Sequence, residues 1–193
     1  WQRYIIAMEK KLNNKITEIS FRDKKDGWKN YYFKLSTANG DVFYEKHGEN
    51  IYMKGFLKDL YLRPSCYDCK FKTLHRASDI TLADFWGIEK IIPEINVEKG
   101  VSLCWASSEK GKQVLADVLK RTDYYEVKLR EAIKHNSSAI KSVEMHKNRD
   151  KFFEEVNNSD ADIISLIEKY YDNRSLRKRL LSKLRTKIKS LYK

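Results

Sequence analysis

Two cysteines, Cys66 and Cys69, are the residues whose types and spacing point most directly to chemistry. A Cys-x-x-Cys pair on a turn places two thiolates on one side of the backbone, where they can chelate one metal centre or form a disulfide. Two thiolates alone do not hold a metal tightly, because zinc and iron–sulfur sites take about four ligands. The pair therefore predicts half of a site that other residues must complete.

Three kinds of site remain open at this point. One is structural zinc, with His75 and one further ligand beside the two cysteines, although the chain has no second Cys-x-x-Cys. Another is a redox dithiol of the thioredoxin type, which normally lies where a strand meets a helix. The last is half of a cubane iron–sulfur site, completed by cysteines that precede Trp1. Cys104, in contrast, lies in an alternating apolar segment and is expected to be a small buried strand residue.

Groups that can carry positive charge follow the pair closely. They are Lys70, Lys72, His75 and Arg76. Such neighbours favour thiolates, or offset the negative charge of a cluster that thiolates hold.

Composition restricts the class of protein. The 193 residues suffice for one domain with a helical appendage, and no run approaches the roughly 20 apolar residues of a membrane helix. The odd number of cysteines indicates a reducing cytoplasm and no secreted disulfide framework. Because the chain opens on Trp1 without a methionine, we expect it to be a piece of a longer protein.

The net charge of +12 is concentrated in the last segment, residues 174–193, which holds nine Lys or Arg residues and no acid. Its apolar stripe predicts a helix that packs on residues 163–170. Attachment to an anionic membrane surface is a second possibility. Nucleic acid is the least favoured partner, because no aromatic or polar base-reading set accompanies the charge.

The elements that must position the cysteines follow from the spacing of apolar and turn residues. Helices are predicted at 1–12, 51–60, 152–156, 163–170 and, after a cap at Ser107 or Ser108, through 114–119. Strands are predicted at 16–21, 31–35, 42–44, 80–82 and 101–106, with Asn39-Gly40 as a hairpin turn. The predicted fold class is α/β (α+β): a mixed or antiparallel sheet with flanking helices and a helical, basic C-terminal tail.

One longer stretch resembles a known family. Arg63-Pro64-Ser65-Cys66-x-x-Cys69-Lys70-Phe71, followed by Ser78-Asp79-Ile80-Thr81-Leu82-Ala83-Asp84-Phe85-Trp86-Gly87-Ile88, resembles the C-terminal domain of the coenzyme F420 hydrogenase/dehydrogenase beta-subunit family. Further agreement comes from Trp1-x-x-Tyr4, Phe21-Arg22-Asp23-Lys24 with Gly27-Trp28, residues 100–103 with 109–111, and His146 to Phe153 around Arg149. The resemblance covers roughly residues 1–155, which predicts a family domain at 1–155 and a helical basic tail at 156–193.

The resemblance implies an iron–sulfur flavoprotein-type oxidoreductase that relays electrons between a 4Fe–4S cluster and a flavin or deazaflavin. Cys66 and Cys69 match two cluster ligands, and the others would come from an upstream N-terminal or ferredoxin-like segment. Lys70 and Arg76 are expected to tune the potential of the cluster. A redox partner protein is also implied. The alternative function is a non-catalytic structural or zinc-binding scaffold domain.

FAD is the second implied cofactor, and its anionic pyrophosphate and flat ring suit basic groups and aromatic faces. The expected cofactor-facing residues are Lys24, Trp28, Asp79, Thr81, Asp84, Trp86 and Gly87. Their alternative roles are structural, with Asp79 capping a turn and Phe85 and Trp86 filling the core. Gly87 allows a backbone conformation or close approach that other residues resist.

The form Asp84-Phe85-Trp86-Gly87 resembles the bacterial branch of the family, whose members often accompany surface-polysaccharide biosynthesis. The expected location is therefore cytoplasmic, with peripheral attachment at the inner membrane surface through the basic tail.

Overall fold

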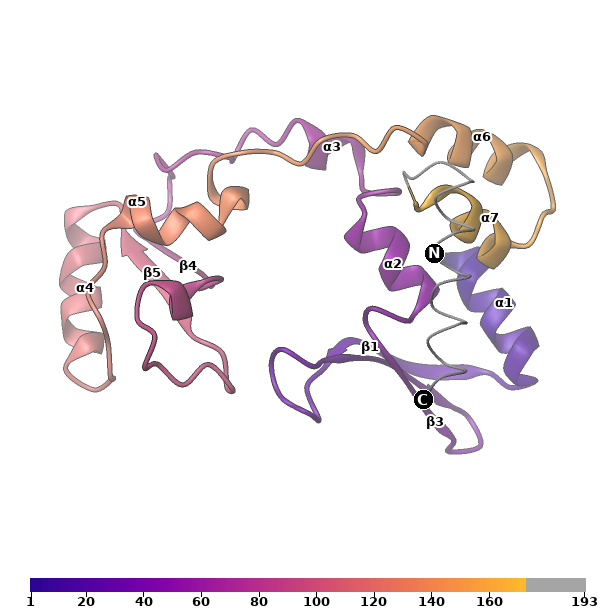
Figure 1. Cartoon of the computed structure of the whole chain (residues 1–193), viewed down its shortest axis with the longest axis horizontal. Helices are drawn as coiled ribbons and strands as arrows, with labels where there is room; N and C mark the ends of the chain where they lie inside the picture. Colours follow the sequence, from indigo (N-terminus) through magenta and orange to yellow (C-terminus); the bar gives the residue numbers. More distant parts are fainter. Residues whose placement is uncertain (173–193) are drawn as a thin grey trace, which may run out of the picture. The chain divides into compact units, whose positions relative to one another are not determined.

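The computed structural model describes residues 1–172, which form two compact units (Figure 1). Within these residues, unit 1 consists of 1–23, 32–62 and 144–172, and unit 2 consists of 24–31 and 63–143. The chain therefore leaves unit 1 twice and returns to it twice. The basic tail expected at 174–193 lies outside the described residues.

Unit 1 contains a three-stranded antiparallel sheet in the order β1 (Ile16–Asp23), β2 (Tyr32–Thr37), β3 (Val42–Lys46). The central strand alternates strictly, with Phe33, Leu35 and Thr37 buried, because successive side chains of a strand point to opposite faces. The hairpin predicted around Asn39-Gly40 joins β2 to β3, and Gly40 adopts φ +91° in the turn. Both the antiparallel sheet and its turn are confirmed.

Four helices complete unit 1: α1 (Gln2–Leu12), α2 (Ile51–Leu57), α6 (Arg149–Asn158) and α7 (Ile163–Tyr170). Helix α7 contacts the other three (Figure 1). Its Ile167 is fully buried, as are Tyr4, Phe33 and Leu60. The apolar spacing in 163–170 thus reflects the position of α7 at the centre of this unit.

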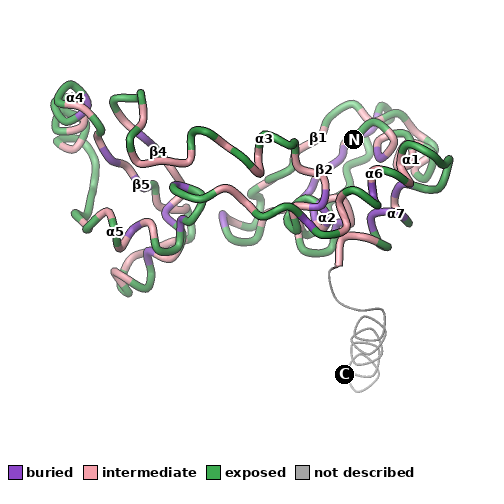
Figure 2. The backbone as a smooth tube through the Cα atoms, turned by 90° about the horizontal axis from the view of Figure 1, so that it is seen from above, coloured by how far each residue is buried: buried purple, intermediate pink, exposed green. Residues whose placement is uncertain are grey.

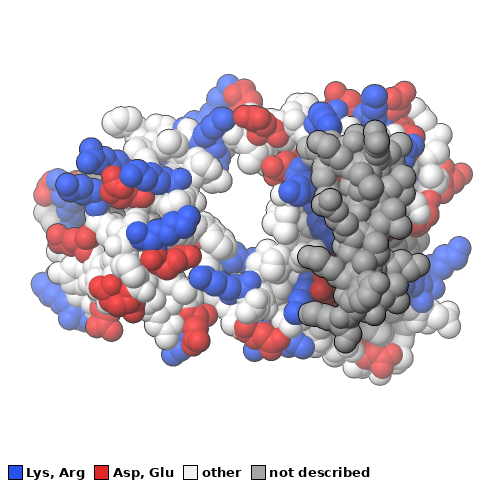
Figure 3. Space-filling model, viewed as in Figure 1, with Lys and Arg blue, Asp and Glu red and all other residues white. Residues whose placement is uncertain are grey.

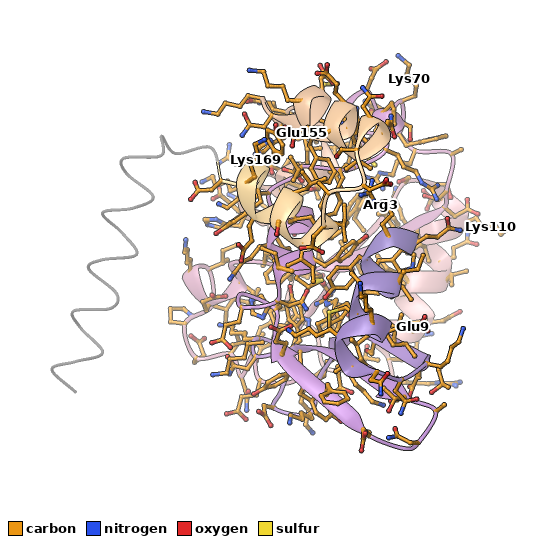
Figure 4. The ribbon with its side chains drawn as sticks, turned by 90° about the vertical axis from the view of Figure 1, so that its right-hand side faces the viewer. Arg3, Glu9, Lys70, Lys110, Glu155 and Lys169 are labelled. Atoms are coloured by element: carbon orange, nitrogen blue, oxygen red, sulfur yellow. The ribbon has the colours of Figure 1, made fainter. Side chains whose placement is uncertain are left out.

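Charged side chains at the edge of unit 1 link its helices, as Figure 4 shows for Arg3, Glu155 and Lys169. The Arg3 guanidinium donates to the carbonyls of Val156, Ser159 and Ala161, which joins α1 to the connection between α6 and α7. Lys169 on α7 donates to the Glu155 carboxylate on α6. These contacts fix the ends of helices whose apolar faces already pack together.

Helix α2 ends at Leu57, three residues before the predicted end at residue 60. Asp59 adopts φ 60°, a left-handed conformation that stops a helix, and Leu60 N–H then donates to the carbonyl of Gly55 at 3.0 Å. Leu60 itself is completely buried. Its apolar character therefore reflects packing after the helix, which spacing alone does not distinguish from helix continuation.

Unit 2 is built on an antiparallel pair, β4 (Ile80–Asp84) and β5 (Ser102–Ala106), with Thr81 opposite Trp105. Unit 2 also contains five short helices among the described residues: α3 (Pro64–Tyr67), η1 (Ile88–Lys90), α5 (Leu129–Ala132), η2 (Ile133–His135) and η3 (Ser137–Ala139). The buried core consists of Phe85, Ile88, Leu103, Trp105, Ala132 and Ala139. Figure 2 shows buried residues in both units, so each unit has an interior of its own.

Helix α4 (Glu109–Leu119) follows β5 directly, as predicted. Its cap is Ser108, whose hydroxyl accepts the N–H of Gly111 at 3.0 Å. A Cβ at Gly111 would collide with the carbonyl oxygen of Asp79. The glycine therefore lets the first turn of α4 approach the start of β4.

Basic and acidic side chains alternate over the face of the described residues that Figure 3 presents. Exposed ion pairs of the described residues include Lys112–Glu109 and Lys120–Asp117. Between residues 1 and 172, no helix is long and apolar enough to cross a membrane.

Candidate functional site

The cysteine loop, residues 63–78, begins with helix α3. Pro64 takes the first helical position, where a missing N–H leaves no helical hydrogen bond unmade. The N–H of Cys66 donates to the carbonyl of Arg63 at 2.9 Å, and the helix ends at Tyr67, with Asp68 as its C-cap. Cys66 and Cys69 are both free thiols and both half-buried. The two thiols therefore lie on a short helix and just after it, partly accessible to solvent.

The cysteine loop is attached to a segment more than sixty residues later, residues 138–142. The N–H of Cys69 donates to the Ser142 hydroxyl at 3.0 Å. Lys72 Nζ donates to the carbonyl of Ser138, and Arg76 Nη2 donates to the carbonyl of Ala139 at 3.1 Å. These bonds at the middle and end of the loop position a segment that has little regular structure of its own.

The positive groups of the loop differ in what they contact. Lys70 forms an exposed ion pair with Asp68 at 2.7 Å, and its hydrogen bond to that carboxylate raises the pKa of Lys70 (Figure 4). Arg76 donates from Nε to the carbonyl of Thr73 at 3.0 Å, and its guanidinium lies over the ring of Trp105. The charge of Lys70 is thus offset locally, whereas Arg76 has only carbonyl and aromatic partners among the described residues.

In the described residues, Cys66 and Cys69 have no further side chains beside them that would complete a metal site. Among residues 1–172, no group of three His, Cys, Asp or Glu side chains comes together to hold a metal ion. His75 accordingly does not complete a zinc set with Cys66 and Cys69. Two accessible free thiols on one anchored loop nevertheless fit half of a thiolate-bound cluster, provided that further ligands come from elsewhere.

Two tryptophans that lie far apart in the sequence of unit 2 form a close, tilted pair. The ring centroids of Trp28 and Trp86 are 4.4 Å apart, with an angle of 34° between the planes. Trp28 is buried, and Gly100, at φ +82°, lies against its indole. Trp86 is 44% exposed, so it does not fill the core, whereas the neighbouring Phe85 does. The pair therefore presents an aromatic surface that a buried ring supports from behind.

Gly87 follows Trp86 in a conformation that few other residues adopt, φ +79°. A Cβ at this position would lie 2.5 Å from the ring of His135. Asn136, next to that histidine, donates to the carbonyls of Ala132 at 2.9 Å and of Trp86 at 3.4 Å. Both properties expected of Gly87, an unusual backbone and a close approach, are confirmed, and His135 is the neighbour that requires them.

Asp79 and Thr81 lie at the opposite end of β4. Asp79 accepts hydrogen bonds from the Ser108 hydroxyl and, through its carbonyl, from the N–H of Ser107 at 2.8 Å, and it pairs with Lys110 at 3.7 Å (labelled in Figure 4). Thr81 is buried opposite Trp105. At about 3.3 Å per residue, roughly 13 Å separates the two ends of β4. The seven expected cofactor residues therefore do not form one cluster.

Lys24 and Asp84 accompany the tryptophan end of unit 2. The exposed Lys24 precedes the turn that leads to Trp28, and its carbonyl accepts the N–H of Gly27 at 2.9 Å. Asp84 closes β4 opposite Ser102. Cys104 lies on β5, as predicted, but it is half-buried and not fully buried; this partial burial raises the pKa of its thiol.

Sequence reasoning missed Ser142, Ser138 and His135, which contact the expected site residues. The first two hold the cysteine loop, and His135 lies against Gly87. His135 and Ser138 had one local signal, the polar segment Lys134-His135-Asn136-Ser137-Ser138 between apolar residues, and Ser142 lies outside that segment. Which loop such residues contact depends on tertiary structure.

Fold and loop together define an α/β domain that presents two free thiols from an anchored segment. The chain belongs to the family described as the C terminus of the coenzyme F420 hydrogenase/dehydrogenase beta subunit, which matches residues 1–132. The family is that of a redox-enzyme component. The match includes all nine expected metal and cofactor residues, and the stretch His146 to Phe153 lies beyond it, so the boundary at 155 stays a prediction.

Comparison with curated proteins gave no match, and comparison with solved structures gave none either.

Proposed function

We propose that this chain is the electron-transfer domain of an iron–sulfur flavoprotein, with Cys66 and Cys69 as two ligands of a 4Fe–4S cluster. The observation that carries the proposal is the pair of accessible free thiols on an anchored loop, in a chain that matches the redox family. The remaining ligands would come from an N-terminal or ferredoxin-like segment, or from a redox partner, outside the described residues. A bound cluster supplies one-electron transfer at a potential that its surroundings set.

The residues around the thiols would hold and tune that cluster. The bond from Cys69 N–H to Ser142 fixes the backbone that carries the second thiolate. We propose that Arg76 contributes more to the local field than Lys70, because Lys70 is already paired with Asp68 in water. Positive charge favours the more negative, reduced state of a cluster and so raises its potential.

The flavin surface of the proposal is the exposed face of Trp86, backed by Trp28. An exposed indole supported by a second ring offers a rigid surface for a flat ring system. Gly87 and Asp84 are close to Trp86 in the sequence, and Lys24 precedes the turn that leads to Trp28; we retain all three as candidates for FAD contact. Asp79 and Thr81 remain in the proposed set as residues that shape β4, since their observed partners are structural.

The test of the cluster uses the native protein purified without oxygen, together with any partner that remains bound. We expect iron and acid-labile sulfide in equal amounts, visible charge-transfer absorption, and loss of all three in the Cys66→Ser, Cys69→Ser double variant. Cys104→Ser is the matched control and should retain them. Stoichiometric zinc without sulfide would replace the proposal with a zinc-binding scaffold.

The test of the flavin surface is independent of the cluster. Trp86→Ala should weaken retention of FAD, while Trp1→Ala, which removes an exposed tryptophan of unit 1, should not. If the Trp86 variant stays fully loaded with flavin, the ring lies elsewhere. A native protein that binds neither flavin nor iron would favour a non-catalytic scaffold.

The proposed setting is cytoplasmic, at the inner membrane surface, in surface-polysaccharide biosynthesis. It rests on the Asp84-Phe85-Trp86-Gly87 form and on the charge of residues 174–193. Sedimentation with vesicles of anionic lipid tests the membrane part. Binding that needs anionic lipid and disappears on deletion of 174–193 supports attachment, and absence of binding at low salt removes it.

A further inference from the structure

Unit 2 contains a cavity of about 390 Å³ at the end of the cysteine loop. Its lining comes from the loop, from the end of β5 and from the first residue of α5: Leu74, His75, Arg76, Trp105, Ala106, Ser107 and Leu129. Small-molecule sites span about 300–1,000 Å³, so the volume lies within their range. The cavity is at the Thr81–Trp105 end of the strand pair, whereas Trp86 follows the Asp84–Ser102 end. It is therefore a different location from the proposed flavin surface.

Arg76 brings a positive charge to this cavity without a carboxylate to neutralise it. Its guanidinium is partly buried and donates to the carbonyls of Thr73 and Ala139. Its partners in the described part of the chain are these carbonyls and the Trp105 ring, and none of the residues that line the cavity is acidic. Guanidinium groups stay protonated and are normally paired when they are withdrawn from water. The cavity thus has an excess of positive charge.

Trp105 contributes a second donor that lacks an acceptor. The residue is only 9% exposed, and its indole N–H has no hydrogen-bond partner among the described residues. Burying such a group without an acceptor costs about 1–3 kcal/mol, so each instance calls for a physical explanation. The indole nitrogen has almost no surface open to solvent, so the cavity meets other atoms of the Trp105 ring, and the N–H signal reports on changes next to the cavity.

The other residues that line the cavity indicate the polarity of the rest of the ligand. His75 and Ser107 are exposed and carry polar side chains, which can hydrogen-bond a second oxygen. Leu74, Ala106 and Leu129, with the face of the Trp105 indole, are apolar. Sites for organic molecules are usually lined by apolar residues with a small number of polar groups.

We propose that this cavity binds a small organic anion, a carboxylate or phosphate carried on an apolar or aromatic body. The anionic oxygens face Arg76 and accept from the hydroxyl of Ser107. The apolar body lies against Leu74 and Leu129. The site shares Arg76 with the cluster proposal, but its test requires neither a bound cluster nor a bound flavin.

The experiment follows the Trp105 indole N–H signal in ¹H–¹⁵N NMR spectra of the full chain, assigned with Trp105→Phe. The probes are benzoate and phenyl phosphate, with benzyl alcohol as the neutral analogue of similar size. We expect saturable shifts of the Trp105 signal with at least one anion, and none with the alcohol at the same concentrations. The anion that binds more tightly identifies the class, carboxylate or phosphate.

The variants test which groups carry recognition. Arg76→Gln should weaken the anion by roughly tenfold or more, as expected when a charged hydrogen bond is lost. Lys110→Gln, which removes an exposed cation paired with Asp79 in the same unit, should leave the affinity unchanged. If Arg76→Gln unfolds the loop, Ser107→Ala with an exposed hydroxyl serves instead and should weaken binding. Absence of shifts with both anions, equal binding of the alcohol, or unchanged affinity in both variants would overturn the proposal.

Discussion

The backbone N–H of Cys69 donates to the hydroxyl of Ser142 at 3.0 Å, across 73 positions of the sequence. Ser142 lies outside the stretch that matches the family, residues 1–132, while Cys69 lies within it. The conformation of the cysteine loop is therefore set in part by residues that follow the matched segment.

Replacement of Ser142 by alanine tests this contact. Loss of one hydrogen bond should cost about 0.5–1.5 kcal/mol locally, which releases the Cys69 backbone more often. We expect faster alkylation of Cys69 and faster hydrogen exchange of its amide, with Cys104 unaffected. Ser137→Ala is the control, because Ser137 is exposed and nearby in the same segment. Equal alkylation and exchange rates in the two variants would mean that the cysteine loop keeps its conformation without the bond to Ser142.

Gly87→Ala should destabilise unit 2 more than Gly40→Ala, a substitution in the hairpin turn, destabilises unit 1. At Gly87, the added Cβ has both a positive φ of 79° and the His135 ring at 2.5 Å. At Gly40, φ is +91° but nothing lies within 4 Å, and Gly48 has neither feature. The expected cost is about 1–2 kcal/mol for the left-handed backbone alone and more where the clash is added.

Urea denaturation of the three glycine variants measures the difference. The order of destabilisation should be Gly87→Ala, then Gly40→Ala, with Gly48→Ala close to the parent protein. If Gly87→Ala and Gly40→Ala lower the free energy of unfolding equally, the His135 ring moves aside in the Gly87 variant. Backbone strain alone then explains why position 87 requires glycine.

Elements with a local signal were predictable from the sequence. Asn39-Gly40 fixed the hairpin through its turn conformation, and a serine before a 3.6-residue period marked the start of α4. The end of α2 was predicted too late, because the apolar Leu60 suits a helix and a following turn equally. Division into two units was not predicted at all, since it depends on contacts between segments as distant as 1–23 and 144–172.

The candidate site was predictable to the extent that residue type determines chemistry. Cys66 and Cys69 follow from spacing, and Gly87 from the absence of a side chain. Which cofactor residues lie together could not be predicted, because residues near one another in sequence are far apart when an extended strand separates them. Asp79 and Trp86 lie beyond opposite ends of β4. Trp28, more than fifty residues earlier, is the actual neighbour of Trp86.

Ser108 and Asp79 provide a further test, of a structural role for Asp79. The Ser108 hydroxyl accepts from Gly111 N–H and donates to the Asp79 carboxylate, so it caps α4 and joins it to β4. Ser108→Ala should destabilise the protein by about 0.5–2 kcal/mol. Asp79→Asn keeps an acceptor at the same position and should cost less. If Asp79→Asn instead leaves stability unchanged and abolishes FAD binding, Asp79 belongs to the cofactor surface.

The last prediction concerns acid stability and His146, which is buried in unit 1. Burial lowers the pKa of His146 below its ordinary value of 6.5, because the charged imidazolium loses water. The unfolded chain then binds a proton at a higher pH than the folded protein does. The contribution of this group to stability is therefore complete above pH 6.5 and is lost as the pH falls below it toward the pKa of the folded state.

Urea midpoints measured from pH 8 downward should fall on the acid side of pH 6.5 in the parent protein. His146→Asn keeps an acceptor near the position of Nδ1, which accepts the N–H of Asn148 at 3.2 Å, but it cannot take up the proton. This variant should be less stable at pH 8, because the smaller side chain leaves space, and should lose part of the acid-side decrease. His75→Asn, at an exposed position, should keep the decrease of the parent protein. If the urea midpoint of His146→Asn falls with pH as steeply as that of the parent protein, the decrease is due to carboxylates, since their protonation is the other source of acid destabilisation.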